Sequence, residues 1–135
     1  KRRQASDIEK RLNLNSAISI YNYMYPKVQD KDIEEAWILL LNQKLDLIEA
    51  KCISHGGITG TAIDVRIILK EALLRNATAI ALCHNHPSGN PRPSREDDNI
   101  TNCLKKAADT MHIYFVDHVI VAQQHFYSYR EEGRI

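Results

Sequence analysis

A largely apolar run that ends at two histidines constrains the fold more than any other feature of the chain. Residues 77–83 read Ala-Thr-Ala-Ile-Ala-Leu-Cys, and His84, Asn85 and His86 follow directly. In an extended chain, side chains two positions apart project to the same side, so the two imidazoles converge on one point. Pro87 has no backbone N–H and stops a central strand from continuing. The sequence therefore predicts a buried strand that delivers two histidines to one end of a sheet.

The rest of the chain alternates between helical and extended patterns. Ser16 and Asp64 are suited to cap helices, and Pro26 is expected to end the first one. The expected elements are a helix over Ala17–Tyr25, strands over Glu35–Leu41 and Leu45–Ser54, a helix from Asp64 to about Arg75, the strand from Ala77, a helix from Ser94 to about Asp109, and strands over Asp117–Ala122 and His125–Arg130. This order predicts an α/β domain with a mixed sheet and helices packed on its faces.

Length and composition limit the class of protein. The 135 residues suit one domain, with a poorly ordered basic start over residues 1–15 and a single domain over 16–135. Lys and Arg number 18 against 17 Asp and Glu, so charge gives no argument for nucleic acid or an anionic membrane. The three cysteines form no CxxC pair, which favours a cytoplasmic protein over a disulfide scaffold. No apolar stretch approaches the ~18 residues of a membrane span, so no membrane partner is expected.

A glycine-rich segment over residues 55–61 is a candidate for phosphate binding. It has the spacing of neither the P-loop nor the dinucleotide-binding fingerprint. Its glycines are therefore interpreted as serving backbone turns.

Two histidines and an aspartate form a candidate metal site. A catalytic zinc commonly takes three protein ligands and leaves one corner to water, and His84, His86 and Asp97 would fill three corners. The proline-rich segment 87–93 is suited to swing the next helix back over the strand end. The alternative is structural, because Ser94 and Asp97 also have the spacing of a helix-capping arrangement that needs no metal.

The spacing of these residues resembles a known signature. His-x-His, seven residues, Ser, two residues and Asp fit His84, His86, Ser94 and Asp97 without a gap. The pattern is similar to that of the JAB/MPN-plus (JAMM) metalloprotease family, and most closely to its RadC branch. Further matches to that branch are HNHPSG at His84–Gly89, Pro93-Ser94, Gly56-Gly57, Asp64–Arg66, Asp117–Val121 and Tyr127–Glu131. The resemblance covers about residues 16–135 and implies the JAB/MPN architecture, which is cytidine-deaminase-like.

The resemblance implies a zinc-dependent hydrolase of amide or peptide bonds whose physiological substrate the sequence does not name. Glu34 would be the general base that activates the metal-bound water, with Glu35 as its rival. Ser94 would donate a hydrogen bond to the developing oxyanion. Two His and one Asp also accept iron, manganese or nickel, so zinc is the expectation of the family.

Two departures limit what the resemblance implies. Peptidase and deubiquitinating members of the wider family carry Ser or Thr where this chain has Asn85, which counts against isopeptidase activity. Longer RadC proteins have an N-terminal segment similar to a helix-hairpin-helix DNA-binding unit, and nothing before Ser16 resembles one, which counts against a role in DNA repair. The alternative is a DNA-repair-associated or nucleic-acid-binding accessory module with a structural metal site. A nucleobase deaminase is discounted because its HxE and PCxxC signature is absent.

Several other residues have structural interpretations. His118, beside Asp117, is interpreted as structural, with support of the site as its alternative role. Cys83 is interpreted as a core thiol that points away from the metal site. The sequence fixes no oligomeric state.

Overall fold

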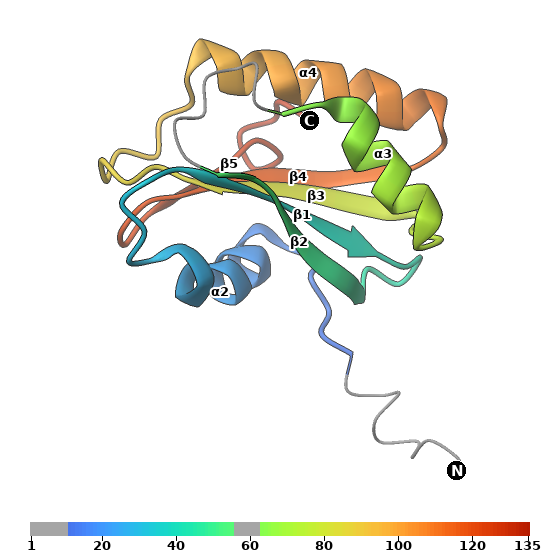
Figure 1. Ribbon diagram of the computed structural model, residues 1–135, viewed down its shortest axis with the longest axis horizontal. Helices are drawn as coiled ribbons and strands as arrows, with labels where there is room; N and C mark the ends of the chain where they lie inside the picture. The colour runs from blue at the N-terminus through green and yellow to red at the C-terminus, as the bar shows by residue number, and fades with distance from the viewer. Residues whose placement is uncertain (1–10, 56–62) are drawn as a thin grey trace.

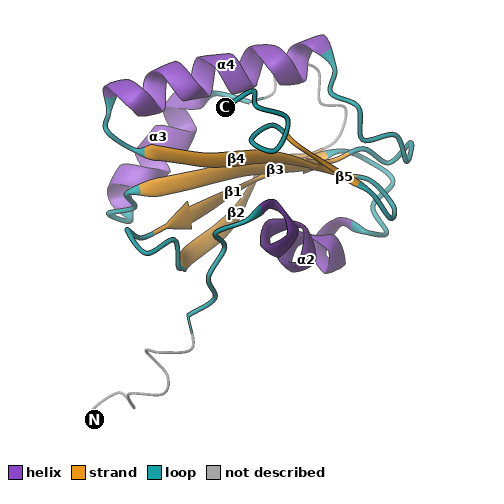
Figure 2. Cartoon of the chain, turned by 180° about the vertical axis from the view of Figure 1, so that it is seen from behind, coloured by secondary structure: helices purple, strands orange, loops and turns teal. Residues whose placement is uncertain are grey.

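The computed structural model describes residues 11–55 and 63–135 (Figure 1). One five-stranded sheet forms the middle layer, with strand order β2-β1-β3-β4-β5. Helix α2 covers one face, and helices α3 and α4 cover the other (Figures 1 and 2). The elements are α2 (Ala17–Val28), β1 (Glu35–Leu41), β2 (Leu47–His55), α3 (Val65–Leu74), β3 (Ala79–Asn85), α4 (Arg95–Thr110), β4 (Tyr114–Val121) and β5 (Phe126–Ser128). The mixed α/β architecture predicted from the sequence is confirmed.

Strand β3 lies at the centre of the sheet and is the junction between its antiparallel and parallel parts. Strand β1 pairs antiparallel with both β2 and β3, whereas β3 pairs parallel with β4. A parallel pair needs a crossover connection, and α4 supplies it between β3 and β4. The carboxyl ends of β3 and β4 therefore lie side by side, at the sheet end where the chain leaves β3 for the histidine segment.

Two apolar cores explain why β1 and β3 read as continuous apolar runs. On the α2 side, the core includes Leu14, Ile20, Met24, Val28, Leu39, Leu41, Ala81, Cys83 and Val119. On the other side, it includes Ile38, Leu40, Ile68, Ala72, Ile80, Leu82, Leu104, Ala108 and Phe115. Every residue of β3 is buried, because a strand covered on both faces has no solvent-facing side. Cys83 is fully buried in the α2-side core, on the opposite face of β3 from His84.

The prediction that Pro26 ends the first helix is wrong. Helix α2 continues through Pro26 to Val28. Pro26 lies in the last turn, where one missing N–H removes a single intrahelical hydrogen bond. Val28 is 2 % exposed and belongs to the α2-side core, so its burial favours the additional turn.

Other boundaries differ by a few residues from the expected ones. Strand β4 begins at Tyr114 instead of Asp117, and β5 ends at Ser128 instead of Arg130. The chain turns after Ser128 because the Arg130 backbone N–H donates to the Asp117 carboxylate. Strand β2 starts at Leu47, two residues later than expected, and includes His55. The rest of the glycine-rich segment lies outside the described residues.

The packed part of the domain begins before Ser16. Asn13 forms an isolated bridge with Asp46, and Leu14 is fully buried in the α2-side core. These contacts fix residues 13 and 14 to the segment that leads into β2. None of the helices within residues 11–55 and 63–135 has the length and apolar content needed to cross a bilayer.

Candidate metal centre

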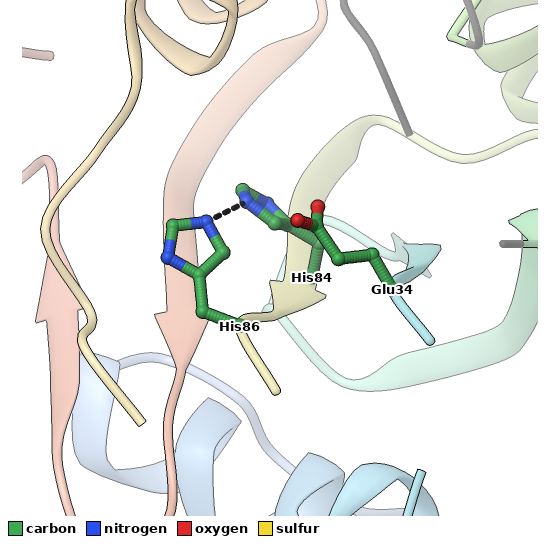
Figure 3. A group of neighbouring side chains, drawn as sticks. All are labelled: Glu34, His84 and His86. Atoms are coloured by element: carbon green, nitrogen blue, oxygen red, sulfur yellow. Dashed lines mark hydrogen bonds between the residues drawn. The ribbon is translucent and has the colours of Figure 1, made fainter. Parts of the chain in front are cut away.

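The two histidines of the predicted site meet at the end of β3. His84 is the second-last residue of the strand and is 1 % exposed, and His86 follows the strand directly. Their Nε2 atoms lie 3.0 Å apart (Figure 3). The alternation of side chains along the strand places both rings on the α4 side, as the sequence predicts.

Asp97 brings a carboxylate to the same point from the first turn of α4. Its Oδ1 lies 3.1 Å from His84 Nε2, and its Oδ2 lies 3.2 Å from His86 Nε2. The three side chains thus present their ligand atoms to one another. A tetrahedron with zinc bonds of about 2.0 Å has edges of about 3.3 Å. Each imidazole nitrogen lies near that distance from the other and from one of the two Asp97 oxygens. Two imidazole nitrogens and a carboxylate oxygen at this spacing fit zinc, and also fit other divalent ions.

Asp97 also serves the helix on which it lies. The Ser94 backbone N–H donates to Asp97 Oδ2 at 2.8 Å, and the Asp97 backbone N–H donates to Ser94 Oγ at 3.0 Å. This reciprocal pair is a capping box, so the structural alternative considered for Ser94 and Asp97 is present in the fold. The cap and the histidine contacts use the same carboxylate, and they do not exclude each other.

The electrostatics of the cluster suit a cation. Burial alone would raise the pKa of Asp97, but the hydrogen bonds and charges of His84 and His86, with the Ser94 N–H, hold it well below its usual range. Burial lowers the pKa of His86, yet the Asp97 carboxylate and the Asn90 carbonyl outweigh burial and raise it. A positive charge between these groups is therefore favoured, as a proton or as a metal ion that displaces it.

The geometry around His86 identifies its free nitrogen. His86 Nδ1 lies 2.8 Å from the Asn90 carbonyl oxygen. A carbonyl only accepts, so Nδ1 carries the proton and a neutral His86 presents the Nε2 lone pair to the cluster. Asn90 lies in the proline-rich segment, which therefore fixes one of the two rings.

Glu34 joins the cluster from the residue before β1. Its half-buried carboxylate and the two histidines place their ligand atoms within 4.8 Å of one another (Figure 3). Glu35, the alternative general base, instead accepts a hydrogen bond from Trp37 Nε1 at 3.1 Å. The structure thus brings the Glu34 side chain to the histidines.

Asn85 holds the backbone on both sides of Glu34. The Glu35 N–H donates to Asn85 Oδ1 at 2.7 Å, and Asn85 Nδ2 donates to the Ile33 carbonyl at 3.2 Å. Asn85 is 3 % exposed and stands between the two histidines in the sequence. Asn85 therefore positions the segment that carries Glu34. The sequence contained no signal for this role, because the contact depends on the β1–β3 register.

A cavity of about 370 Å³ opens beside His86 at the carboxyl ends of β3 and β4. It is lined by the end of α2 with residues 29–32, by Asn85, His86 and Pro87, and by residues 121–123. Asp30, Lys31 and Asp32 make part of its wall charged. In open α/β sheets, ligands bind outside the carboxyl ends of parallel strands, which is where this cavity lies.

The fold and these side chains define a single-sheet α/β domain with a candidate metal centre at one sheet end. The chain belongs to the RadC-like JAB domain family, whose sequence profile matches residues 14–134. A UPF0758 protein of Flavobacterium johnsoniae is 38% identical over 133 residues, which are 98% of this chain and 58% of that protein. A UPF0758 protein of Symbiobacterium thermophilum is 37% identical over 92% of this chain and 53% of its own length. The chain thus spans little more than half the length of these relatives.

Proposed function

We propose that this domain is a zinc-dependent hydrolase that cleaves an amide or peptide bond. The observation that carries the proposal is the convergence of His84 Nε2, His86 Nε2 and the Asp97 carboxylate, with the Glu34 carboxylate beside them. JAB domains are often metal-dependent hydrolases, and membership of the RadC-like JAB family supports the same chemistry.

Each residue of the cluster has a chemical role in this proposal. His84, His86 and Asp97 would hold the ion, which when bound would lower the pKa of a water to about 7 and polarise a carbonyl. Glu34, which could itself reach an ion beside the two histidines, is assigned the proton transfer because Asp97 already supplies a third ligand at 3.1 and 3.2 Å from the imidazoles. It would take a proton from the attacking water and pass it to the leaving amine. Ser94 Oγ accepts the Asp97 N–H, so its own proton is left to donate to the oxyanion of the substrate.

Of the cluster residues only His86 lines the cavity, so we propose that the cavity receives a part of the substrate that flanks the reacting bond. Its charged and polar wall over residues 29–32 suits a polar peptide or amide better than an apolar ligand. We also propose a cytoplasmic location, since the three cysteines, Cys52, Cys83 and Cys103, lie far apart in the sequence and form no CxxC pair.

Metal content tests the site. Untagged protein analysed by inductively coupled plasma mass spectrometry is expected to contain near one zinc per chain, and His84→Ala and Asp97→Ala are expected to lose it. Glu96→Ala, which changes an exposed carboxylate of the same helix turn, is the matched control and keeps its zinc. Wild-type protein that neither contains nor takes up zinc contradicts the proposal.

Cleavage tests the chemistry. Zinc-loaded protein is incubated with a mixed peptide library, and new amino termini are detected by mass spectrometry. Glu34→Gln is expected to keep zinc and to cleave about 10²- to 10⁴-fold more slowly. Glu35→Gln is the neighbouring control and keeps the rate. Full zinc occupancy without cleavage contradicts the hydrolase and supports an accessory module with a structural metal.

A further inference from the structure

A chain of buried hydrogen bonds leads away from the candidate metal centre through His84. His84 Nδ1, the ring nitrogen that faces away from Asp97, lies 2.8 Å from His118 Nε2. His118 Nδ1 lies 2.6 Å from Thr101 Oγ1, and Thr101 Oγ1 donates to the Asp97 carbonyl at 2.7 Å. His84, His118 and Thr101 are each at most 1 % exposed, so water does not compete for these contacts. We call His84, His118 and Thr101 the imidazole relay.

The acceptor at the far end gives the relay a direction. The Asp97 carbonyl only accepts, so the single hydroxyl proton of Thr101 points to it. Thr101 Oγ1 then accepts from His118 Nδ1–H, which leaves His118 Nε2 as an acceptor. His118 Nε2 in turn accepts from His84 Nδ1–H. The remaining nitrogen of His84, Nε2, carries the lone pair that faces Asp97 and His86.

Packing prevents His118 from escaping this arrangement by turning its ring. The Tyr129 ring stacks on it with an interplanar angle of 9° and a centroid distance of 4.9 Å. Tyr129 is itself fixed, because its hydroxyl donates to Asp98 at 2.6 Å. The Arg134 guanidinium lies over the Tyr129 ring, with its central carbon 4.9 Å from the ring centroid. The segment after β5 thus holds the relay in place.

We propose that Thr101 and His118 are positioning residues that hold His84 in the tautomer with a free Nε2. The inference rests on the proposed metal centre for its function, because a metal can bind only the unprotonated nitrogen. The helix α4 therefore contributes twice. Its Asp97 side chain faces the Nε2 atoms of His84 and His86. Its Thr101 hydroxyl acts through His118 to keep the proton of His84 on Nδ1.

The tautomers are measured directly in zinc-free protein by long-range ¹H–¹⁵N correlation NMR of the imidazoles. We expect His84 and His118 both to carry the proton on Nδ1. Thr101→Val removes the acceptor for His118 Nδ1–H, so His118 is expected to move its proton to Nε2 and His84 to become protonated on Nε2. Thr101→Ser, which restores the hydroxyl, is expected to give the wild-type tautomers. Nε2–H tautomers in the wild type, or unchanged ones in Thr101→Val, overturn the relay.

Zinc affinity provides the functional readout, measured by competition with a chelator. Thr101→Val is expected to bind zinc about 10- to 100-fold more weakly than the wild type. Thr110→Val is the matched control, because Thr110 makes the same hydroxyl bond to the carbonyl four residues earlier in α4 but is exposed. It is expected to leave zinc affinity unchanged. His118→Gln retains a side-chain acceptor for His84 and is expected to weaken binding less than His118→Leu.

The two measurements separate failure of the relay from failure of the metal centre. Wild-type protein with the expected tautomers and no zinc affinity contradicts the metal centre and leaves the relay supported. Wild-type protein that binds zinc, together with a folded Thr101→Val variant of equal affinity, overturns the relay and leaves the metal centre intact.

Discussion

The two histidines of the candidate centre are held by different parts of the molecule. His84 is fixed from inside the core, where its Nδ1 meets His118 on β4, and 2 % of its side chain is exposed. His86 is fixed from the surface segment, where its Nδ1 meets the Asn90 carbonyl, and 12 % of its side chain is exposed. The orientation of one ring depends on side chains of the core. The orientation of the other depends on the backbone of a proline-rich loop.

This difference teaches that the two ligands can be perturbed separately. A substitution in the core changes the proton on His84 without touching the loop. A substitution in the loop moves His86 without reaching His118. Stability and metal affinity should therefore respond differently to the two kinds of change.

The largest contrast is expected between His84→Ala and His86→Ala in the presence of a chelator. His84→Ala leaves a buried cavity and removes a partner of His118, so it should lower the free energy of unfolding by about 2 to 4 kcal/mol. His86→Ala removes a half-buried ring whose partner lies near solvent and should cost about 1 kcal/mol. Urea unfolding measures both. Equal losses would contradict the division between a core and a loop ligand.

A smaller effect on the free energy of unfolding is expected from pH, and it arises from His118 in the core. Burial, followed by the charge of His84, lowers the pKa of His118 well below its usual range. The unfolded chain therefore takes up a proton below about pH 6.5 that the folded protein does not, and stability falls as pH decreases by up to about 1.4 kcal/mol per unit. The ionisable groups that act on His118 are His84, His86 and Asp97.

The variant His118→Gln isolates this contribution. His86 acts in the opposite direction, because its raised pKa makes the folded state bind its proton more tightly. Urea unfolding of chelated protein between pH 7.5 and 5.5 is expected to show a steeper loss for the wild type than for His118→Gln. Parallel curves for the two proteins would mean that His118 takes up its proton over the same pH range in the folded and the unfolded chain.

The smallest effect is expected on the loop side, at Gly89. Gly89 has φ of +88°, and its N–H donates to the His86 carbonyl at 3.0 Å. A Cβ there meets only Gln123 at 3.8 Å, so Gly89→Ala costs backbone strain of about 1 kcal/mol without a clash. Zinc affinity should fall by less than in Thr101→Val, and the His84 tautomer should not change. A changed His84 tautomer in this variant would show that loop and core are coupled.

The parts of the site that follow from local pattern were predictable. The alternation of a strand places His84 and His86 on one face, and the spacing of Ser94 and Asp97 predicts a helix start. Cys83, one position away, lies on the opposite face in the core. In each case the argument needs only neighbouring residues and the geometry of a single element.

The support of the site depends on pairings between distant segments, and the sequence did not determine these. Thr101 reaches His118 only because α4 crosses over the sheet to begin β4 beside β3. Asn85 reaches Ile33 and Glu35 only through the register of β1 against β3. The sequence left a supporting role for His118 open but gave no partner for it, and it gave no indication of Thr101. The end of the first helix was wrongly predicted for a related reason. The proline signal at Pro26 is local, whereas the burial of Val28 that favours a further turn depends on the packing of α2 against the sheet.

The double use of Asp97 has a consequence for how such centres are gained and lost over evolution. Its carboxylate caps α4 whether or not an ion is present, so selection for a well-formed helix retains Ser94 and Asp97 after metal binding has ceased to matter. His84 is also retained by folding, because it is buried and contacts His118, whereas His86 contacts only a loop carbonyl outside the cluster. In a comparison of sequences, Ser94, Asp97 and His84 therefore report partly on folding, and His86 is the better marker of a working centre.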